Sequence, residues 1–113
     1  MNSYFWKIGA LSAGSSIAVQ AIGGHKPWSV EKKMIFTRGW EIQFSSAVGL
    51  MVMATKKNSG KLKALGGISL LLGSLIFSGL IYYRCFTDDK SYNYLMPIGG
   101  GTTMLGWLML VFI

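Results

Sequence analysis

The chain has 113 residues, of which 51% are hydrophobic and only 13% are charged. Soluble domains carry about 25% charged residues to cover their surface, so this composition argues against a water-soluble globule, and its hydrophobicity excludes intrinsic disorder. The single cysteine, Cys85, excludes an internal disulfide and a cysteine-rich zinc site. The formal net charge of +7 is compatible with nucleic-acid binding. Whether the chain is suited to that role depends on where its charges lie.

Four stretches are long and apolar enough to cross a bilayer, which takes about 20 helical residues. They are residues 4–23, 34–54, 62–83 and 95–113. Of the 15 charged residues, 11 lie outside them and the other four lie in the early part of a stretch, as expected when a charge at mid-membrane costs about 2.5–3.5 kcal/mol. We predict one domain over residues 1–113, an all-α integral membrane four-helix bundle.

The connections between these stretches are short, so consecutive helices should run up, down, up and down, with both termini on the same side. The second helix is expected to begin near residue 30, at the membrane interface, because Ser29 is a good N-cap and Glu31 would follow in the first turn. Val19-Gln20-Ala21 resembles a signal-peptide cleavage site, but we expect the first stretch to be retained as a helix.

Small residues recur at four-residue spacing in three stretches, which places them on one face of each helix and lets backbones approach closely. They are Gly9, Ala10, Ala13, Gly14 and Ala18 in the first stretch, Ser69, Gly73, Ser74 and Ser78 in the third, and Gly99, Thr102, Thr103 and Gly106 in the fourth. Such faces either pack the four helices together, which is the interpretation we favour, or dock onto a larger membrane partner.

Lys56, Lys57, Lys61 and Lys63 form the densest cationic cluster. A basic cluster beside a membrane attracts anionic headgroups, at about 1 kcal/mol per charge, so we predict contact with membrane lipids such as cardiolipin or phosphatidylserine. The same lysines also suit a loop that only orients the protein. No aromatic residue is interleaved with them to stack on bases, so nucleic acid is not an expected partner.

Arg38 and Glu41 are three residues apart on one helix face, where they can pair. Ionisable residues within a membrane mark ion or proton paths by default, but near the start of a span they also snorkel to the interface, which we favour. His25 is the only histidine and has no ligand at metal-binding spacing. No nucleophile is paired with a base, so we predict no catalytic, cofactor or metal site and no enzyme.

The chain resembles the transmembrane protein 256-like family of small four-helix membrane proteins of bacteria and mitochondria. The residues that carry the resemblance are 8–14 (IGALSAG), Gly24-His25, 72–83 (LGSLIFSGLIYY), 95–100 (LMPIGG) and 105–108 (LGWL). The resemblance implies membrane residence and this fold, but no particular activity. Family members carry several histidines early in the second span, where this chain has Ile42, Gln43 and Ser46, so a metal or proton role of those histidines does not carry over.

These features favour a non-catalytic accessory or structural subunit of a respiratory-chain complex in the mitochondrial inner membrane, with other membrane subunits as partners. The alternative is a small stand-alone transporter or channel-like bundle that uses Arg38, Glu41, Gln43 and His25. Lys and Arg are almost evenly shared between the two sides of the expected bundle, so the positive-inside rule leaves its orientation open.

Overall fold

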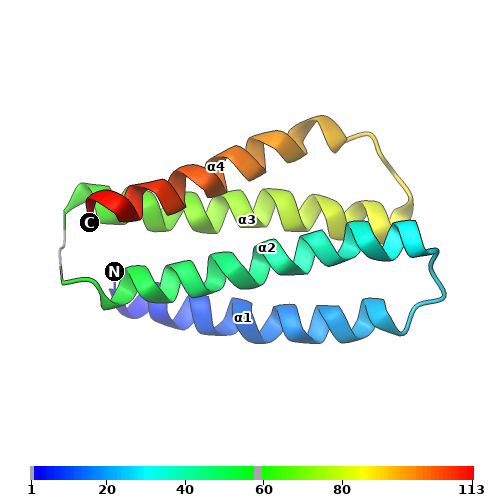
Figure 1. Ribbon diagram of the computed structural model, residues 1–113, viewed down its shortest axis with the longest axis horizontal. Coiled ribbons are helices and arrows are strands. Elements are labelled where there is room, and N and C mark those ends of the chain that lie inside the picture. Colours follow the sequence, from blue (N-terminus) through cyan, green and yellow to red (C-terminus); the bar gives the residue numbers. More distant parts are fainter. Residues whose placement is uncertain (1, 58–59) are drawn as a thin grey trace.

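A computed structural model describes residues 2–57 and 60–113. It contains α1 (Asn2–Gly24), α2 (Val30–Thr55), α3 (Lys61–Thr87) and α4 (Met96–Met109), with the 3₁₀ turns η1 (Asn93–Leu95) and η2 (Leu110–Phe112) on either side of α4. No strand occurs in these two ranges, which confirms the predicted all-helical class. Consecutive helices run in opposite directions, and both ends of the chain lie at the same end of the molecule (Figure 1).

The start of α2 and the end of α3 are fixed by local chemistry. The Ser29 hydroxyl accepts a hydrogen bond from the Lys32 backbone N–H at 3.2 Å, so Ser29 is the N-cap that the sequence predicts. Glu31 stands in the first turn, where the helix dipole favours a negative charge. At the other end, α3 stops at Asp88, whose φ of 59° lies in the left-handed region typical of helix C-caps.

The four helices form an open layer, which is flatter than the bundle predicted from the sequence. Each helix packs along its neighbour in the sequence, but α1 and α4 lie at opposite edges and share no extended contact in the part of the chain described (Figure 1). Across the helices the molecule measures 27 by 18 Å. Each outer helix contacts the inner helix beyond its neighbour through one aromatic ring. Phe5 of α1 packs on Gly67 of α3, and Trp107 of α4 packs on Gly49 of α2.

Two apolar clusters fill the two ends of the layer. Near the chain termini, the first cluster consists of Phe5, Leu50, Met53 and Leu70. At the opposite end, the second consists of Phe36, Ile81 and Cys85. The Trp28 ring meets Phe36 edge-on, with the ring centroids 5.1 Å apart. Burial is therefore concentrated along the α2–α3 contact, which positions the ends of these two helices relative to each other.

Small residues bring α3 and α4 into close contact. A Cβ atom on Gly73 would lie 2.5 Å from the backbone nitrogen of Thr103, and one on Gly106 would lie 2.9 Å from the backbone nitrogen of Leu70. Gly99 is equally tight, since its Cβ position is 2.7 Å from the Phe77 nitrogen. No side chain larger than hydrogen fits at these three positions without moving a backbone.

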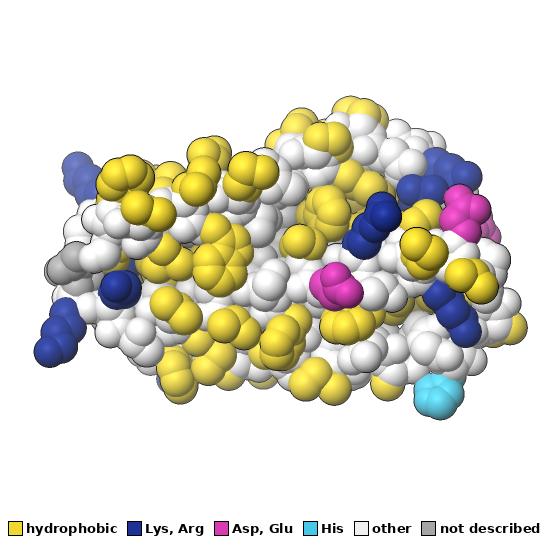
Figure 2. Space-filling view, in the orientation of Figure 1, with side chains coloured by type: hydrophobic (Ala, Val, Ile, Leu, Met, Phe, Trp, Pro, Cys, Tyr) yellow, Lys and Arg dark blue, Asp and Glu magenta, His cyan; other side chains and the backbone are white. Residues whose placement is uncertain are grey.

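The outer surface of the layer is largely apolar. Leu11, Leu75 and Met104 are each at least 60% exposed, and hydrophobic side chains cover much of the middle of the face in Figure 2. By length and hydropathy, two segments of the described chain are apolar enough to span a membrane, Lys61–Thr87 and Asn93–Phe112. This is fewer than the four spans predicted, because α1 is interrupted by serines, glycines and Gln20, and α2 carries charges in its first half.

Candidate functional site

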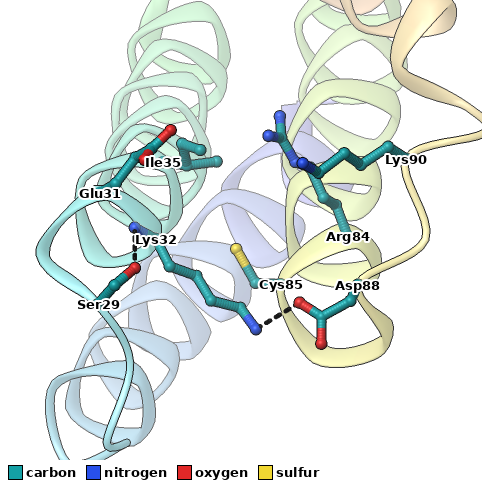
Figure 3. A pocket seen from close by; sticks show the side chains of 8 residues that line it. All are labelled: Ser29, Glu31, Lys32, Ile35, Arg84, Cys85, Asp88 and Lys90. Carbon is teal, nitrogen blue, oxygen red and sulfur yellow. Dashed lines mark hydrogen bonds and ion pairs between the residues drawn. The ribbon is translucent and has the colours of Figure 1, made fainter.

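A cleft of about 180 Å³ opens between the first turns of α2 and the last turn of α3, at the end of the molecule away from the termini. It is lined by Ser29, Glu31, Lys32, Ile35, Arg84, Cys85, Asp88 and Lys90 (Figure 3). Five of these eight residues are of charged types, two acidic and three basic. The antiparallel packing of α2 on α3 creates the cleft, because it places the beginning of one helix beside the end of the other.

One side of the cleft is closed by an ion pair. Lys32 Nζ donates to Asp88 Oδ1 at 2.7 Å, with Lys32 23% exposed and Asp88 79% exposed. The hydrogen bond from Lys32, together with its charge, lowers the pKa of the Asp88 carboxyl. Lys32 Nζ also lies 5.1 Å from the ring centroid of Trp28, a distance suited to a cation–π contact. The first turn of α2 is thereby held to the C-cap of α3.

The other charged groups of the cleft have no such partner. In residues 2–57 and 60–113, neither an ion pair nor a side-chain hydrogen bond engages Glu31, Arg84 or Lys90. Figure 3 shows that Arg84, from α3, and Lys90, from the loop after it, extend into the same part of the cleft, with Glu31 across from them on α2. The cleft can therefore bind a charged group, and Cys85 lies buried behind it.

A chain of hydrogen bonds crosses the layer nearer its middle. Gln43 of α2 donates through Nε2 to the Ser12 carbonyl of α1 at 2.9 Å, and its Oε1 accepts from the Tyr82 hydroxyl of α3 at 2.5 Å. Ser78 of α3 donates to the Gly39 carbonyl of α2 at 2.6 Å. These bonds join three helices, which is the ordinary role of polar residues between membrane helices.

The residues named for a transporter are not brought together. Arg38 and Glu41 are both exposed, and no ion pair joins them within the described ranges. His25 is exposed beyond the end of α1, whereas Gln43 is held between α1 and α3. A transport role of these four residues stays a prediction.

The predicted lipid cluster is divided by the structure. Lys56, Lys57 and Lys61 are exposed at the end of the molecule that holds the termini. Lys63 is only 3% exposed and donates a short hydrogen bond to the Lys56 carbonyl. The last carbonyls of a helix have no intrahelical partner and carry partial negative charge, so the C-terminus of α2 binds the Lys63 ammonium. In this conformation the Lys63 ammonium is therefore engaged within the chain, and contact of the lysines with lipid headgroups stays a prediction.

The predicted packing residues fall into two sets. Gly9, Gly73, Ser74, Ser78, Gly99, Thr103 and Gly106 are buried, and Ala13, Ser69 and Thr102 are partly buried. Ala10, Gly14 and Ala18 are exposed on α1, and no atom lies within 4 Å of a Cβ built on Gly14. The latter three therefore do not pack helices of this chain together, in contrast to the interpretation we favoured for the small residues of the first stretch.

The charged cleft itself was missed by the sequence reasoning. The short connections between the helices could have predicted it, because they place the start of the second helix beside the end of the third. Taken alone, the adjacent pair Asp88 and Asp89 in a polar turn indicates only a solvated loop. This fits Asp89, whose carboxylate accepts hydrogen bonds from Ser91 and from the Tyr83 hydroxyl. It overlooks Asp88, which is paired across to α2.

Residues 19–100, well over half of the chain, match a family described as "Protein of unknown function (DUF423)". The chain belongs to the DUF423 family. It is 28% identical over 111 residues to a UPF0382 membrane protein of Staphylococcus epidermidis, a match that covers 92% of this chain and 88% of the relative. The corresponding match to a UPF0382 membrane protein of Haemophilus influenzae is 27% identical and covers 99% and 94%. No solved structure matches the chain.

The matches bear on location more than on activity. YwdK of Bacillus subtilis, 25% identical over 115 residues with 92% of this chain and 89% of the relative covered, is also a UPF0382 membrane protein. This DUF423 chain is accordingly a membrane protein, as predicted. The relatives are bacterial, so they give no support to the mitochondrial inner membrane, a respiratory complex or cardiolipin. They also leave the resemblance to the transmembrane protein 256-like family untested.

Proposed function

We propose that the protein is a non-catalytic, multi-pass membrane subunit that packs sideways against a larger membrane protein. The proposal rests on one observation: large apolar side chains point outward from the open layer of helices and are exposed. Ile17 of α1, Leu75 of α3 and Val111 after α4 are each about 60–75% exposed. Soluble monomers rarely expose contiguous apolar surface on this scale, whereas lipid tails or a partner's helices cover it at no cost.

The docking surface that we favour is the open face of α1. Ala10, Gly14 and Ala18 are spaced four residues apart and are exposed, so a partner helix can approach the α1 backbone there. The equivalent glycines of α3 and α4 are already in contact with each other. Because the relatives are bacterial, the proposal names a membrane partner but neither an organelle nor a respiratory complex.

Lys56, Lys57 and Lys61 are the remaining headgroup candidates of the proposal. Their exposure at the end of α2 and the start of α3 suits contact with anionic lipid. Lys63 does not belong to this set, since its ammonium is engaged by Lys56.

Two measurements test the proposal. The native chain should stay with membranes after alkaline carbonate washing, and mild-detergent native gels should show it in a band much heavier than its own 12.4 kDa. Gly14→Leu should release it from that band, because the leucine obstructs the open face of α1. Gly79→Leu is the matched control, since Gly79 lies on α3 with nothing within 4 Å of its Cβ position. Migration of the native chain only as a small free species would contradict the docking role.

A further inference from the structure

The charged cleft between α2 and α3 presents opposite charges on its two sides. Arg84 and Lys90 approach from α3 and from the loop that follows it, and Glu31 faces them from α2 (Figure 3). None of the three forms an ion pair with another described residue. The remaining two charges, Lys32 and Asp88, form an ion pair at 2.7 Å. Lys90 acts on the Asp88 carboxyl through its charge alone, so Glu31, Arg84 and Lys90 are the charged side chains of the cleft that a ligand can bind directly.

This arrangement suits a ligand that carries a phosphate and an ammonium group. Two neighbouring cations repel each other, and a phosphate between them removes the repulsion while accepting charge-assisted hydrogen bonds. The arginine offers a planar fork of donors and the lysine a compact charge, both of which bind phosphate well. The Glu31 carboxylate, on the opposite side, accepts hydrogen bonds from an ammonium group.

A separate apolar hollow lies on α3 and on the loop that follows it. It is lined by Leu80, Tyr83 and Tyr92. Leu80 lies one helical turn before Arg84 on the same side of α3, and Tyr92 follows Lys90 by two residues in the loop. The two tyrosine rings pack edge-on at 5.8 Å and are 41% and 45% exposed, as aromatic rings at the headgroup level of a bilayer commonly are. The hollow is therefore built by the same end of α3 and the same loop that supply Arg84 and Lys90.

We propose that this cleft binds the headgroup of an aminophospholipid, with its phosphate on Arg84 and Lys90, its primary ammonium on Glu31, and an acyl chain over Leu80, Tyr83 and Tyr92. The site lies at the opposite end of the molecule from Lys56, Lys57 and Lys61. The inference rests on the membrane residence in the proposed function and is independent of any docking partner.

Lipid binding to the purified full-length chain in detergent tests the site. Short-chain phosphatidylethanolamine, phosphatidylcholine and phosphatidylglycerol would be titrated separately, with binding followed by calorimetry. We expect phosphatidylethanolamine to bind about tenfold more tightly than phosphatidylcholine, because a trimethylated nitrogen donates no hydrogen bond to Glu31, a loss of about one charge-assisted bond. Equal affinities for these two lipids would overturn the assignment of the ammonium to Glu31.

Variants separate the two halves of the site. Glu31→Gln should reduce the preference for phosphatidylethanolamine over phosphatidylcholine, because the amide oxygen accepts a weaker hydrogen bond from the ammonium than the carboxylate does. Lys90→Gln and Arg84→Gln should each weaken all three lipids about tenfold, by loss of a charge-assisted bond to phosphate. Lys57→Gln, at the far end, is the control and should bind as the native chain does. Lys90 lies outside every helix, so its variant stays informative if Arg84→Gln fails to fold. Native affinity in the Lys90→Gln variant would overturn the phosphate site.

Soluble glycerophosphoethanolamine distinguishes a lipid from a free phosphoester. It should bind at least tenfold more weakly than the lipid, because it leaves the hollow at Leu80 uncovered; equal binding would overturn the lipid assignment. The carbonate wash keeps the two proposals apart. A chain that resists the wash but binds no phosphatidylethanolamine contradicts this inference alone, whereas a chain released by the wash contradicts membrane residence itself.

Discussion

Lys32 and Asp88 join the first turn of α2 to the C-cap of α3 across 56 residues of sequence, at 2.7 Å between Nζ and Oδ1. Asp88 adopts a φ of 59°, a conformation that asparagine and aspartate tolerate better than other non-glycine residues. The same residue therefore ends α3 and fixes it against α2. The position of the charged cleft depends on both roles.

The ion pair predicts a loss of stability in acid. Because Lys32 lowers the pKa of the Asp88 carboxyl below its ordinary 3.8, its contribution to the free energy of unfolding is fully present above pH 3.8 and is lost as the pH falls through the lowered value. Thermal unfolding in detergent between pH 7 and pH 2 measures it. Asp88→Asn keeps the left-handed conformation but not the charge, so its acid-induced loss should be smaller than that of the native chain. Equal losses would contradict the pairing.

The close contact of α3 and α4 predicts opposite effects at two glycines of the same helix. Gly73→Ala should lower the free energy of unfolding by about 1–3 kcal/mol, because the new Cβ meets backbone atoms of α4 that have no room to move. Gly79→Ala should be neutral or stabilising by up to about 1 kcal/mol, since the position is open and alanine favours the helix. The free energy of unfolding of both variants would be measured in the same detergent. Equal destabilisation by Gly73→Ala and Gly79→Ala would contradict the close contact and indicate that α3 tolerates no substitution.

Hydrophobic length and capping chemistry are local properties, so the sequence alone locates the helices well. The stretch 62–83 falls within α3, and Ser29 caps α2 as its chemistry requires. The lateral order of the helices is not local. The positions of α1 and α4 at opposite edges go together with the packing of Phe5 on Gly67 and of Trp107 on Gly49. The spacing of residues within one helix does not show which other helix supplies the glycine.

The same limit applies to the candidate site. Four lysines close in the sequence resemble a single cluster, yet Lys63 in the first turn of α3 donates to the Lys56 carbonyl at the end of α2. Conversely, Glu31 and Arg84 are 53 positions apart and share a cleft. A charge cluster in the sequence therefore indicates a binding site only once it is known how the helices pack and which charged side chains they bring together.

The engagement of Lys63 predicts a structural rather than a lipid-binding role. Lys63→Met should cost about 1–3 kcal/mol in unfolding free energy, because the Lys56 carbonyl at the end of α2 loses a charge-assisted hydrogen bond from a buried donor. Binding of the variant to anionic vesicles should be unchanged. Lys61→Met is the matched control, with the reverse result expected: native stability and weaker vesicle binding, since Lys61 is exposed. Weaker vesicle binding by a fully stable Lys63→Met variant would show that the headgroup prediction was right.

Two buried serines should respond differently to the loss of their hydroxyl groups. Ser78 Oγ donates to the Gly39 carbonyl of α2 at 2.6 Å, so Ser78→Ala should destabilise the fold by about 0.6–1 kcal/mol, the usual value of a hydrogen bond between membrane helices. Ser46, 1% exposed, has an Oγ with no hydrogen-bond partner in the described residues. Removing an unsatisfied buried hydroxyl relieves its desolvation cost, so Ser46→Ala should be neutral or stabilising. The two alanine variants have the same size change and similar burial, so denaturant or thermal unfolding compares only the hydrogen bond. A Ser46→Ala variant as damaged as Ser78→Ala would mean that Ser46 has a bonded partner, such as a buried water molecule between the helices.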